Sequence, residues 1–579
     1  MARLPADVAR RIVLARGNGK IALALLTFTI EHVALLLLVL ACAAGMGTLF
    51  ARSMPLPLRA ALGLGVWGEA LFVLAAVGEL RAIPIVALAV LSVAGCLLSV
   101  YRDRQPTTDN RQLILLLLLF LPLVLLAIHP PLAFDETLYH LPTIRSLATY
   151  GQLRYASELR FPVFPQLQEL LCVPLYLLAG DAATHLISLA EALITAALLL
   201  EWGGWLAAAF FLGSPIVIYL ATTGYVDAAL TLFVAAAFYC IDASAWRRQS
   251  CRRIVTPARL PAPHLAGFLL GVACSVKYLG GYFAVVGLVY VFARHGATRG
   301  AQTFLSARAK FIIACALAAL PTTLWIVLNT GNPVFPFFDR HYTAPRLFQF
   351  TRPWRVVWDA TFARARMNFE PPMTPLLIPA VVVLILAAVR DARARAVALL
   401  AAGYLLVFAF LPQDTRYLVP LLPLIAIVVA GAIPSKRWLV WIAVAPGILY
   451  AGYRFHVDGL PPATAAEREA FLARRVPEYR AVMRAGAGTI YVCGGEQLKG
   501  YAKGKMLGDL FGPWAFKTVL AHRSDTAAIA ERLRPIGADY FLVAKKVCKP
   551  PRATGGMELV YEDAGAQLWR VQPSQPSRR

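Results

Sequence analysis

The chain has 579 residues, of which 59% are hydrophobic and 15% are charged. Soluble domains contain about 45–50% apolar and about 25% charged residues, so this composition excludes an ordinary soluble protein and indicates a polytopic helical membrane protein. A formal net charge of +24 would suggest a nucleic-acid partner in a soluble protein. Arginines also collect in the cytoplasmic loops of membrane proteins, and the sequence shows no nucleic-acid-binding motif, so we expect no nucleic-acid partner.

Long apolar segments separated by short polar loops run through most of the chain. At about 20 residues per crossing, they predict about 13–15 transmembrane helices. The segments lie near 32–50, 60–79, 83–100, 112–128, 183–200, 206–221, 226–243, 265–276, 280–293, 311–328, 374–389, 397–411, 417–432 and 437–452. The shorter apolar stretch 166–180 follows Pro165 and contains Pro174, so we expect a juxtamembrane or re-entrant helix there.

Clusters of lysine and arginine predict which loops face the cytoplasm. The clusters lie at 102–111, 247–253, 294–310, 390–395 and 435–437. If these loops are cytoplasmic, the stretch after residue 128, the loop 329–373 and the chain beyond residue 453 lie on the outer side. The same count places the N-terminus outside, although residues 1–20 are basic. Either an extra helix near 12–30 places the basic N-terminus in the cytoplasm, or an amphipathic N-terminal segment lies on the membrane surface.

These patterns divide the chain into three parts. Residues 1–111 are predicted to form N-terminal membrane helices, and residues 454–579 a soluble domain. Between them, residues 112–453 are predicted to form a transmembrane core with outer loops at 129–165 and 329–373. The chain shows no internal repeats of solenoid type, so we treat each part as a separate unit.

The C-terminal part has the composition of a small α/β domain. TIYVC (489–493) and DYFLVA (539–544) predict buried strands, and LVYEDAGAQLWRV predicts a terminal hairpin. AEREAFLARRVPEYRAVM has helical spacing, and a further helix precedes the second strand, so we expect a partly parallel sheet. Cys493 and Cys548 are able to pair if the domain faces an oxidising compartment. GGEQLKG lacks the spacing of a nucleotide-binding loop, so we expect this domain to dock the acceptor or cover the site.

Polar residues from distant parts of the chain fall at the outer ends of apolar segments. HPPLAFDETLYHLP (129–142) contains Asp135, Glu136, Tyr139 and His140, directly after a leucine-rich segment. Later positions on the same side are Glu169, Tyr225, Asp227, Lys277, Asn332, Gln413 and Arg416. Structural alternatives exist: Lys277 as a membrane-edge anchor, Asn332 as a turn former and Asp227 as a helix N-terminal residue. Acids and bases that share one leaflet instead indicate a site for an anionic, lipid-linked substrate and a polar acceptor.

Sugar transfer from a lipid phosphate needs two kinds of side chain. The departing lipid phosphate gains negative charge, which lysine, arginine or a divalent cation stabilises. The acceptor hydroxyl loses a proton, which an ionised carboxylate within hydrogen-bond distance accepts. Attack from the face opposite the phosphate inverts the anomeric carbon. Because phosphate is already a good leaving group, one base and one phosphate clamp are sufficient.

Short motifs along the chain resemble those of the GT-C superfamily of integral-membrane glycosyltransferases. They are FDETLYHLP, FPVFPQLQELL, TTGYVDAAL, GFLLGVACSVKYLGGYF, TGNPVFPFF and QDTRYLVPLLP, in this order within residues 112–432. The set is similar to that of the bacterial phospholipid-carrier-dependent branch, which is related to the protein O-mannosyltransferases and to the aminoarabinose transferase of lipid A. This chain departs from the simpler members because three apolar segments precede the one that leads into FDETLYHLP.

The resemblance implies a polytopic GT-C fold and a polyprenyl-phosphate-linked sugar donor. The acceptor would be a lipid, glycan or protein of the cell envelope. The protein would lie in the bacterial inner membrane, with the active site and the C-terminal domain facing the periplasm.

The resemblance also implies roles for individual residues. Asp135 is the expected catalytic base. Glu136 is the alternative base, or binds a divalent cation, Mg²⁺ or Mn²⁺, together with Asp135. Lys277 and Arg416 are expected to bind the lipid phosphate. The residues expected to line the cavity are His140, Tyr139, Glu169, Tyr225, Asp227, Asn332 and Gln413.

Two other kinds of protein handle lipid-linked glycans. A transporter or flippase places charged residues near the bilayer midplane, often in two inverted repeats, whereas the polar residues of this chain lie at one leaflet. An O-antigen polymerase or ligase uses a large loop rich in arginine and histidine, and the acidic first loop argues against it. Release of free lipid phosphate from a polyprenyl-phosphoryl monosaccharide would discriminate the glycosyltransferase from both.

Overall fold

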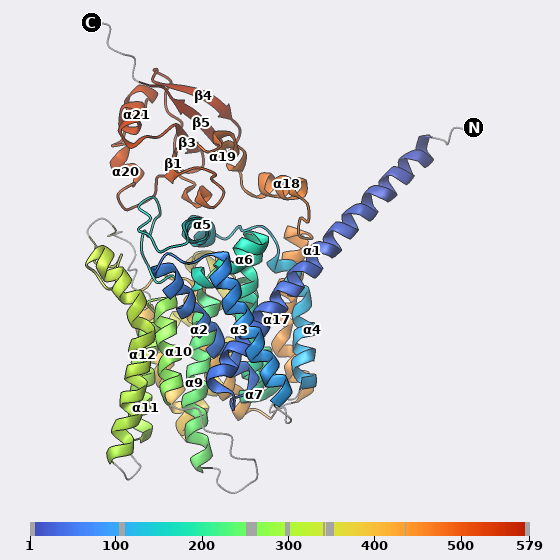
Figure 1. Cartoon of the computed structure of the whole chain (residues 1–579), viewed down its shortest axis with the longest axis vertical. Helices are drawn as coiled ribbons and strands as arrows, with labels where there is room; N and C mark the ends of the chain where they lie inside the picture. Colours follow the sequence, from blue (N-terminus) through green and yellow to red (C-terminus); the bar gives the residue numbers. More distant parts are fainter. Residues whose placement is uncertain are drawn as a thin grey trace.

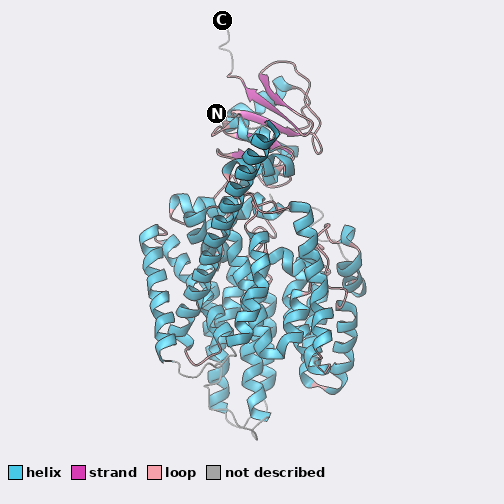
Figure 2. Ribbon diagram, turned by 90° about the vertical axis from the view of Figure 1, so that its right-hand side faces the viewer, coloured by secondary structure: helices cyan, strands magenta, loops and turns pink. Residues whose placement is uncertain are grey.

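A bundle of helices carries a small α/β domain on one of its two ends. The computed structural model describes residues 6–102, 110–249, 263–295, 301–339, 342, 352–434 and 436–573. In Figure 1 the C-terminal domain, in orange and red, lies above the bundle, and Figure 2 shows the same arrangement after a quarter turn. We call the end of the bundle that faces this domain the C-domain end.

Most helices of the bundle coincide with the predicted apolar segments. They are α1 (Ala6–Ala51), α2 (Leu56–Ala76), α3 (Ala82–Arg102), α4 (Asn110–Ala127), α5 (Leu141–Tyr150), α6 (Leu167–Ala179), α7 (His185–Leu212), α8 (Pro215–Ala221), α9 (Asp227–Gln249), α10 (Pro263–Val276), α11 (Gly280–His295), α12 (Ala301–Thr330), α13 (Pro353–Phe362), α14 (Leu377–Arg390), α15 (Ala392–Phe408), α16 (Leu422–Ala432) and α17 (Arg437–Asp458). Shorter helical turns are η1 (Glu136–His140), η2 (Ala182–Thr184), η3 (Arg364–Arg366) and η4 (Thr415–Leu421).

Several helices are suited to crossing a membrane. Within the described ranges, six are long and apolar enough to do so: Ala22–Ala51, Leu56–Ala76, Ala182–Leu212, Ala307–Thr330, Thr415–Ala432 and Arg437–Asp458. Shorter apolar helices of 10–17 residues accompany them: Ala82–Leu97, Ile114–Ala127, Leu167–Ala179, Pro263–Val276, Gly280–Phe292 and Leu377–Arg390. The predicted polytopic helical membrane protein is confirmed, and the expected number of crossings depends on the shorter helices as well.

The helices α6 and α7 correspond to two places where the apolar segments were predicted to be short or interrupted. The 13 residues of α6 span about 20 Å, less than the about 30 Å of a hydrocarbon core, which agrees with the expectation that 166–180 does not cross fully. The predicted separation of 183–200 from 206–221 lies at Gly204, where α7 is kinked by a backbone φ of 76°. Glycine adopts this conformation without the steric cost of a side chain.

The first helix spans the N-terminal segment for which two alternatives were considered. α1 is continuous from Ala6 to Ala51 and has 46 residues. It therefore joins the helix expected near 12–30 to the apolar segment 32–50 without a break.

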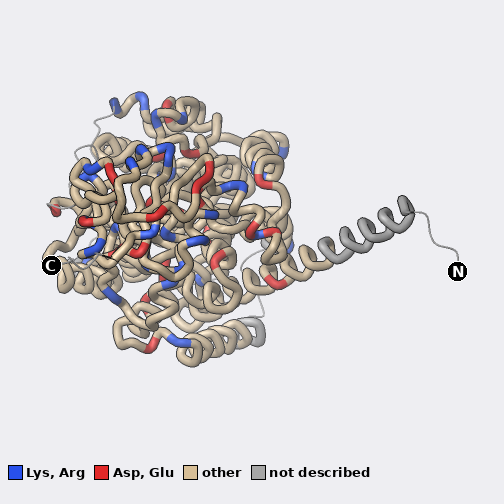
Figure 3. Tube along the Cα trace, turned by 90° about the horizontal axis from the view of Figure 1, so that it is seen from above, with Lys and Arg blue, Asp and Glu red and all other residues tan. Residues whose placement is uncertain are grey.

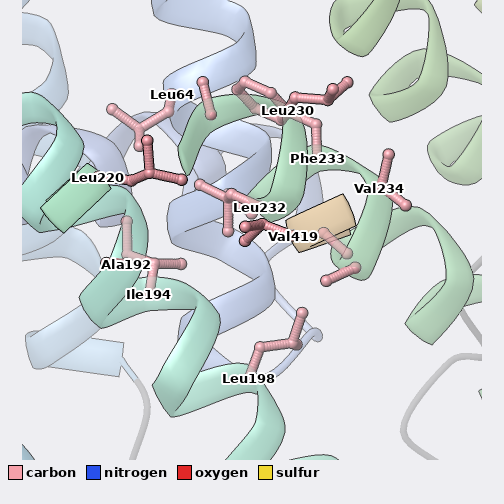
Figure 4. Close-up of a cluster of buried hydrophobic side chains, with 14 of the residues drawn as sticks. Leu64, Ala192, Ile194, Leu198, Leu220, Leu230, Leu232, Phe233, Val234 and Val419 are labelled. Carbon is pink, nitrogen blue, oxygen red and sulfur yellow. The ribbon is translucent and has the colours of Figure 1, made fainter. Parts of the chain in front are cut away.

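The hydrophobic core of the bundle lies where α2, α7, α8, α9 and η4 meet. Leu64, Leu198, Leu220, Phe233 and Val419, one from each of these elements, are all buried and belong to a single cluster (Figure 4). Close packing of this kind leaves little freedom for one element to shift against another. The beginnings of α9 and η4, which carry polar residues at the C-domain end, are therefore held in a fixed relation.

The C-terminal domain is the predicted partly parallel α/β unit. Its strands are β1 (Ile490–Cys493), β2 (Met506–Leu507), β3 (Tyr540–Ala544), β4 (Met557–Glu562) and β5 (Ala566–Val571), in the sheet order β2-β1-β3-β5-β4. β2, β1 and β3 are parallel, whereas β5 is antiparallel to β3 and to β4. The two predicted strands and the terminal hairpin are confirmed.

Helices cover both faces of this sheet. The helical elements of the domain are α18 (Ala465–Arg475), α19 (Tyr479–Ala485), η5 (Glu496–Gly500), α20 (Phe516–Val519), α21 (Thr526–Leu533) and η6 (Arg534–Ile536). Alternate residues of β1 point to opposite faces, so that Ile490 packs with Val482 of α19 and Tyr491 with Ile529 of α21. The predicted helix AEREAFLARRVPEYRAVM is divided into α18 and α19, because Pro477 cannot donate a backbone hydrogen bond.

A disulfide joins Cys493 and Cys548, as the sequence allowed, across 55 residues. Closing a loop of this length stabilises the folded domain by about 4 kcal/mol through the entropy of the unfolded chain. We expect the double variant Cys493→Ala, Cys548→Ala to lose protease resistance in residues 454–579 while the helical bundle stays resistant. Limited proteolysis of the purified membrane protein checks this, with Cys42→Ala, which removes a buried free thiol of the bundle, as the control. Equal resistance of both variants would contradict it.

Candidate active site

The loop between α4 and α5 carries the acidic motif. Asp135 immediately precedes η1, a π-helical turn that continues into α5. Such turns are rare and are often found at functional sites. The adjacent carboxylates point to different partners: Asp135 Oδ2 lies 2.7 Å from Nη2 of Arg416, whereas Glu136 Oε1 is hydrogen-bonded to Nε2 of His185.

Glu136 anchors the turn to the bundle behind it. Its side chain is buried, and Oε1 also accepts a hydrogen bond of 3.0 Å from the backbone N–H of Gly224. A Cβ atom at Gly224 would lie 2.4 Å from this oxygen, so a larger residue there would displace the Glu136 carboxylate. Because Glu136 is held by α7 and by the turn before α9, the geometry favours Asp135 of the two as the group that meets a substrate.

Arg416 is the centre of the polar cluster. It follows the extended residue Asp414 and lies in the first turn of η4. Its Nη2 atom lies 2.7 Å from Asp135 Oδ2 and 2.9 Å from Asp414 Oδ2, and its Nε atom lies 3.2 Å from Glu370 Oε1. Its backbone N–H also donates to Glu370 Oε2 at 3.0 Å. One guanidinium therefore connects three carboxyl groups from three separate segments.

Lys277 forms the second cationic position. It lies between α10 and α11, and its Nζ atom is 2.7 Å from Oδ1 of Asp227, the first residue of α9. Asp227 is fully buried, and its second oxygen has no hydrogen-bond partner. The Lys277 side chain as a whole is 21% exposed. Lys277 thus presents charge at the same end of the bundle as Asp135.

Aromatic rings lie between and beside the charged groups. The Tyr417 ring centre is 4.2 Å from Lys277 Nζ and 5.2 Å from Arg416 Cζ. The Tyr225 ring centre is 4.4 Å from Arg416 Cζ. Tyr139 donates a long hydrogen bond of 3.4 Å to Asp135 Oδ2. The rings stabilise the cations by cation–π attraction and bring Tyr139 and Tyr225 into the predicted site.

The protonation of the loop residues follows from burial and neighbouring charge. Burial alone would raise the pKa of Asp135, but the Arg416 guanidinium holds that pKa below its ordinary value. Burial raises the pKa of Glu370 to about 8, and Arg416 only partly opposes this. Burial lowers the pKa of Lys277, and the carboxylate of Asp227 acts in the opposite direction. At neutral pH Asp135 is therefore ionised and Glu370 is mostly neutral.

The expected divalent-cation site is not formed by these residues. Among the residues that the structure describes, no group of three or more His, Cys, Asp or Glu side chains is arranged to hold a metal ion. Asp135 is paired with Arg416, and Glu136 with His185, so the two carboxylates do not converge on a common point. The donor set does not fit the Mg²⁺ or Mn²⁺ hypothesis, and we derive no step through a metal.

Other predicted site residues support the cluster from outside it. His140 Nδ1 is hydrogen-bonded to Glu169 Oε1, and both side chains are buried. Gln413 donates to the backbone oxygens of Phe408 and Leu411, which shapes the turn before Arg416. Asn332 donates to Phe337 O and accepts from Val334 N, so its side-chain bonds build the turn after α12. These contacts fit the alternative role considered for Asn332, that of a turn former.

Four residues of the cluster were absent from the predicted site: Glu370, Asp414, His185 and Tyr417. Glu370 and Asp414 both contact Arg416, and His185 pairs with Glu136. Asp414 lies in the QDTRYLVP motif, so its spacing from Arg416 was a usable signal. Glu370 is a single carboxylate before two prolines in a long loop, and His185 lies at the start of an apolar helix. The sequence around Glu370 and around His185 shows no pattern that would identify either residue as part of a site before the fold is known.

Charged residues at the far end of α9 lie away from this cluster. Asp242 follows Asp227 by 15 positions on the same helix, which corresponds to about 22 Å. Its Oδ2 atom lies 2.5 Å from Nη2 of Arg393, a member of the basic cluster 390–395. This basic cluster therefore lies toward the end of the bundle opposite to Lys277, as the predicted topology requires. Seen from above, acidic and basic residues are interspersed across the molecule (Figure 3).

Comparison with known proteins identifies relatives of both parts of the chain. A family model described as "Dolichyl-phosphate-mannose-protein mannosyltransferase" matches residues 181–332, which include Asp227 and Lys277. A family model described as "SF2091/S2213" matches residues 467–570, in the C-terminal domain. The curated "Uncharacterized protein SF2093/S2215" of Shigella flexneri is 39% identical over 69 residues, which are 12% of this chain. The match covers 34% of that relative, so the chain spans about a third of its length.

Two solved structures share the architecture. ArnT from Cupriavidus metallidurans in the apo state superimposes with a TM-score of 0.52 at 16% identity, covering 79% of this chain and 98% of that one. ArnT from the same organism bound to undecaprenyl phosphate gives a TM-score of 0.51 at 14% identity, covering 80% and 98%. Together with the mannosyltransferase model, these similarities confirm the GT-C fold that the motifs predicted.

Proposed function

We propose that this chain, which has the fold of the GT-C glycosyltransferases, transfers a sugar from a polyprenyl-phosphate carrier to an acceptor of the cell envelope. The observation that carries the proposal is the convergence of Asp135, Arg416 and Lys277 at the C-domain end. The mannosyltransferase family model and the similarity to an undecaprenyl-phosphate-bound structure support a lipid-phosphate donor. The proposed location is the bacterial inner membrane, with this end facing the periplasm.

In the proposed reaction the cations bind the donor phosphate. Lys277 has three N–H donors and uses one for Asp227, so the others are available for phosphate oxygens. The five donors of Arg416 allow it to contact phosphate while it keeps Asp135 in place. Charge on the phosphate increases as its bond to the sugar breaks, and a cation fixed in advance stabilises that charge without reorganisation.

Asp135 is the proposed base of this reaction. Its depressed pKa keeps it ionised at neutral pH, so it is ready to accept the proton of the acceptor hydroxyl. The hydroxyl oxygen then bonds to the anomeric carbon from the face opposite the phosphate, and the sugar is transferred with inversion. The polyprenyl phosphate departs with the electron pair of the broken bond.

Incubation of the purified protein in lipid nanodiscs with polyprenyl-phosphoryl monosaccharides and an envelope lipid extract tests this function. We expect release of free polyprenyl phosphate together with appearance of the sugar in the acceptor fraction. Movement of an intact lipid-linked sugar across proteoliposomes, without release of the lipid phosphate, would overturn the proposal in favour of a flippase.

Glu370 predicts an alkaline limit for donor binding. Its pKa of about 8 means that the carboxyl is neutral at pH 7 and ionises as the pH rises through 8, beside Arg416, Asp414 and Asp227. The added negative charge repels the donor phosphate, so we expect the Kd for a polyprenyl-phosphoryl sugar to rise on the order of tenfold between pH 7 and pH 9. A phosphodiester keeps one charge over this range. The Glu370→Gln variant should lose the part of this rise that comes from Glu370 and keep the part that comes from deprotonation of Lys277, whose pKa is lowered by burial. A profile identical to that of the wild type would contradict the assignment.

A further inference from the structure

The C-terminal domain touches the catalytic loop directly. One turn of this domain, residues 494–501 (GGEQLKGY), lies against η1, and we call it the docking turn. A Cβ atom added at Gly500 would lie 2.8 Å from the backbone oxygen and 2.9 Å from the Cα atom of Thr137. The backbone of Gly500 therefore packs closely against the backbone and the Cβ atom of Thr137. Thr137 is two residues from Asp135, so this contact lies close to the proposed base.

Hydrogen bonds hold the docking turn on both sides of η1. Tyr501 donates through its hydroxyl to the backbone oxygen of Pro131, at 2.6 Å, on the N-terminal side of Asp135. Arg145 of α5 donates to the backbone oxygens of Gly500 and Ala502, on the C-terminal side. The segment that carries Asp135 is thus attached to the C-terminal domain before and after the catalytic position.

A buried ionic network fixes the docking turn in place. Arg160, from the same outer loop as Asp135, donates through Nε to Asp509 Oδ1 at 2.9 Å and through Nη2 to Glu496 Oε1 at 3.2 Å. Lys499 donates to Asp509 Oδ2 at 3.2 Å. All four side chains are buried, so the interactions are little weakened by solvent and the loss of one member leaves an unpaired buried charge.

The same network reaches toward the residue before the base. Arg160 Cζ lies 5.8 Å from the ring centre of Phe134 and 4.7 Å from that of Phe511. Cys493 immediately precedes the docking turn and is joined by the disulfide to Cys548. Contacts of these kinds belong to a fixed interface and would have to break for the domain to move as a lid.

We infer that the C-terminal domain is a positioning part of the active site, in which the docking turn presses on η1 and orients Asp135 toward Arg416. Glu136 holds η1 from the bundle side, and the docking turn holds it from the opposite side. Gly500, Tyr501, Arg145 and Arg160 are positioning residues, since they contact the loop or the turn. The inference rests on the proposed function only where kcat for sugar transfer is measured.

Gly500→Ala tests the contact with the smallest possible change. The added methyl group must displace Thr137, so we expect kcat to fall about tenfold while the Kd for the polyprenyl-phosphoryl donor stays within about twofold. As Asp135 moves from Arg416, the acidic limb of the kcat profile should shift to higher pH, which a loss of folded protein alone would not produce. The control is Gly452→Ala in α17, an exposed position where a Cβ atom meets no neighbour within 4 Å.

A second variant and a measurement without turnover complete the test. Tyr501→Phe removes only the hydrogen bond to Pro131 and should reduce kcat in the same direction by a smaller factor, even if Gly500→Ala fails to fold. Hydrogen–deuterium exchange of residues 134–140 should increase in both variants whether or not the sugar donor is correctly identified. Wild-type exchange and kcat in folded Gly500→Ala and Tyr501→Phe proteins would overturn the inference. Increased exchange in a protein without transferase activity would support it and count against the proposed function alone.

Discussion

Asp135→Asn is expected to lower the rate of sugar transfer by about 10²–10⁴-fold, the contribution usual for a positioned general base. Asparagine has nearly the same shape but cannot accept the proton of the acceptor hydroxyl. Arg416 keeps its contacts with Asp414 and Glu370, so the guanidinium stays in place. Single-turnover transfer from a radiolabelled polyprenyl-phosphoryl sugar measures the rate, and donor Kd should change little.

The matched control for this prediction is Asp414→Asn. Asp414 also pairs with Arg416, at 2.9 Å compared with 2.7 Å for Asp135, so both variants remove one negative charge from the same guanidinium. If Asp135 is the base, the Asp414 variant keeps most of the activity. Equal losses in the two variants would show that charge balance at Arg416, rather than proton transfer by Asp135, limits the reaction.

The sequence could identify the acidic motif but could not separate its two carboxylates. Asp135 and Glu136 are adjacent in a loop, and no local pattern shows which one faces a substrate. The distinction depends on Gly224 and His185, which lie far along the chain and meet Glu136 only in the folded bundle. The assignment of Asp135 as the base stays a prediction, but the geometry now supplies a reason for it.

Local patterns predicted the elements better than they predicted the connections between them. Hydrophobic spacing located the membrane helices and the strands of the C-terminal domain, because buried segments have periodic or continuous runs of apolar residues. The break between α18 and α19 was not predicted, although Pro477 signals it. The contact between Gly500 and Thr137 was not, because a backbone-to-backbone approach between distant segments depends on how the two domains pack.

Lys277→Ala is expected to weaken binding of the polyprenyl-phosphoryl donor by about 100-fold, because it removes a cation from a partly buried site where solvent screens charge poorly. A lysine that only anchored a helix at the membrane edge would contribute nothing to donor affinity. Equilibrium binding of a fluorescent donor analogue to the protein in nanodiscs distinguishes these roles. The control is Lys310→Ala in α12, an exposed lysine at which we expect no change in affinity.

The loss of Lys277 also leaves the carboxylate of Asp227 buried without its partner, and that stranded charge would repel a phosphate by itself. The double variant Lys277→Met, Asp227→Asn removes both charges together and keeps the net charge of the wild type. If Lys277 binds phosphate directly, the double variant regains only the part of the affinity lost to repulsion by Asp227 and stays well below the wild type. Recovery of donor affinity in the double variant would instead assign Lys277 the role of neutralising Asp227, and the donor phosphate would then depend on Arg416.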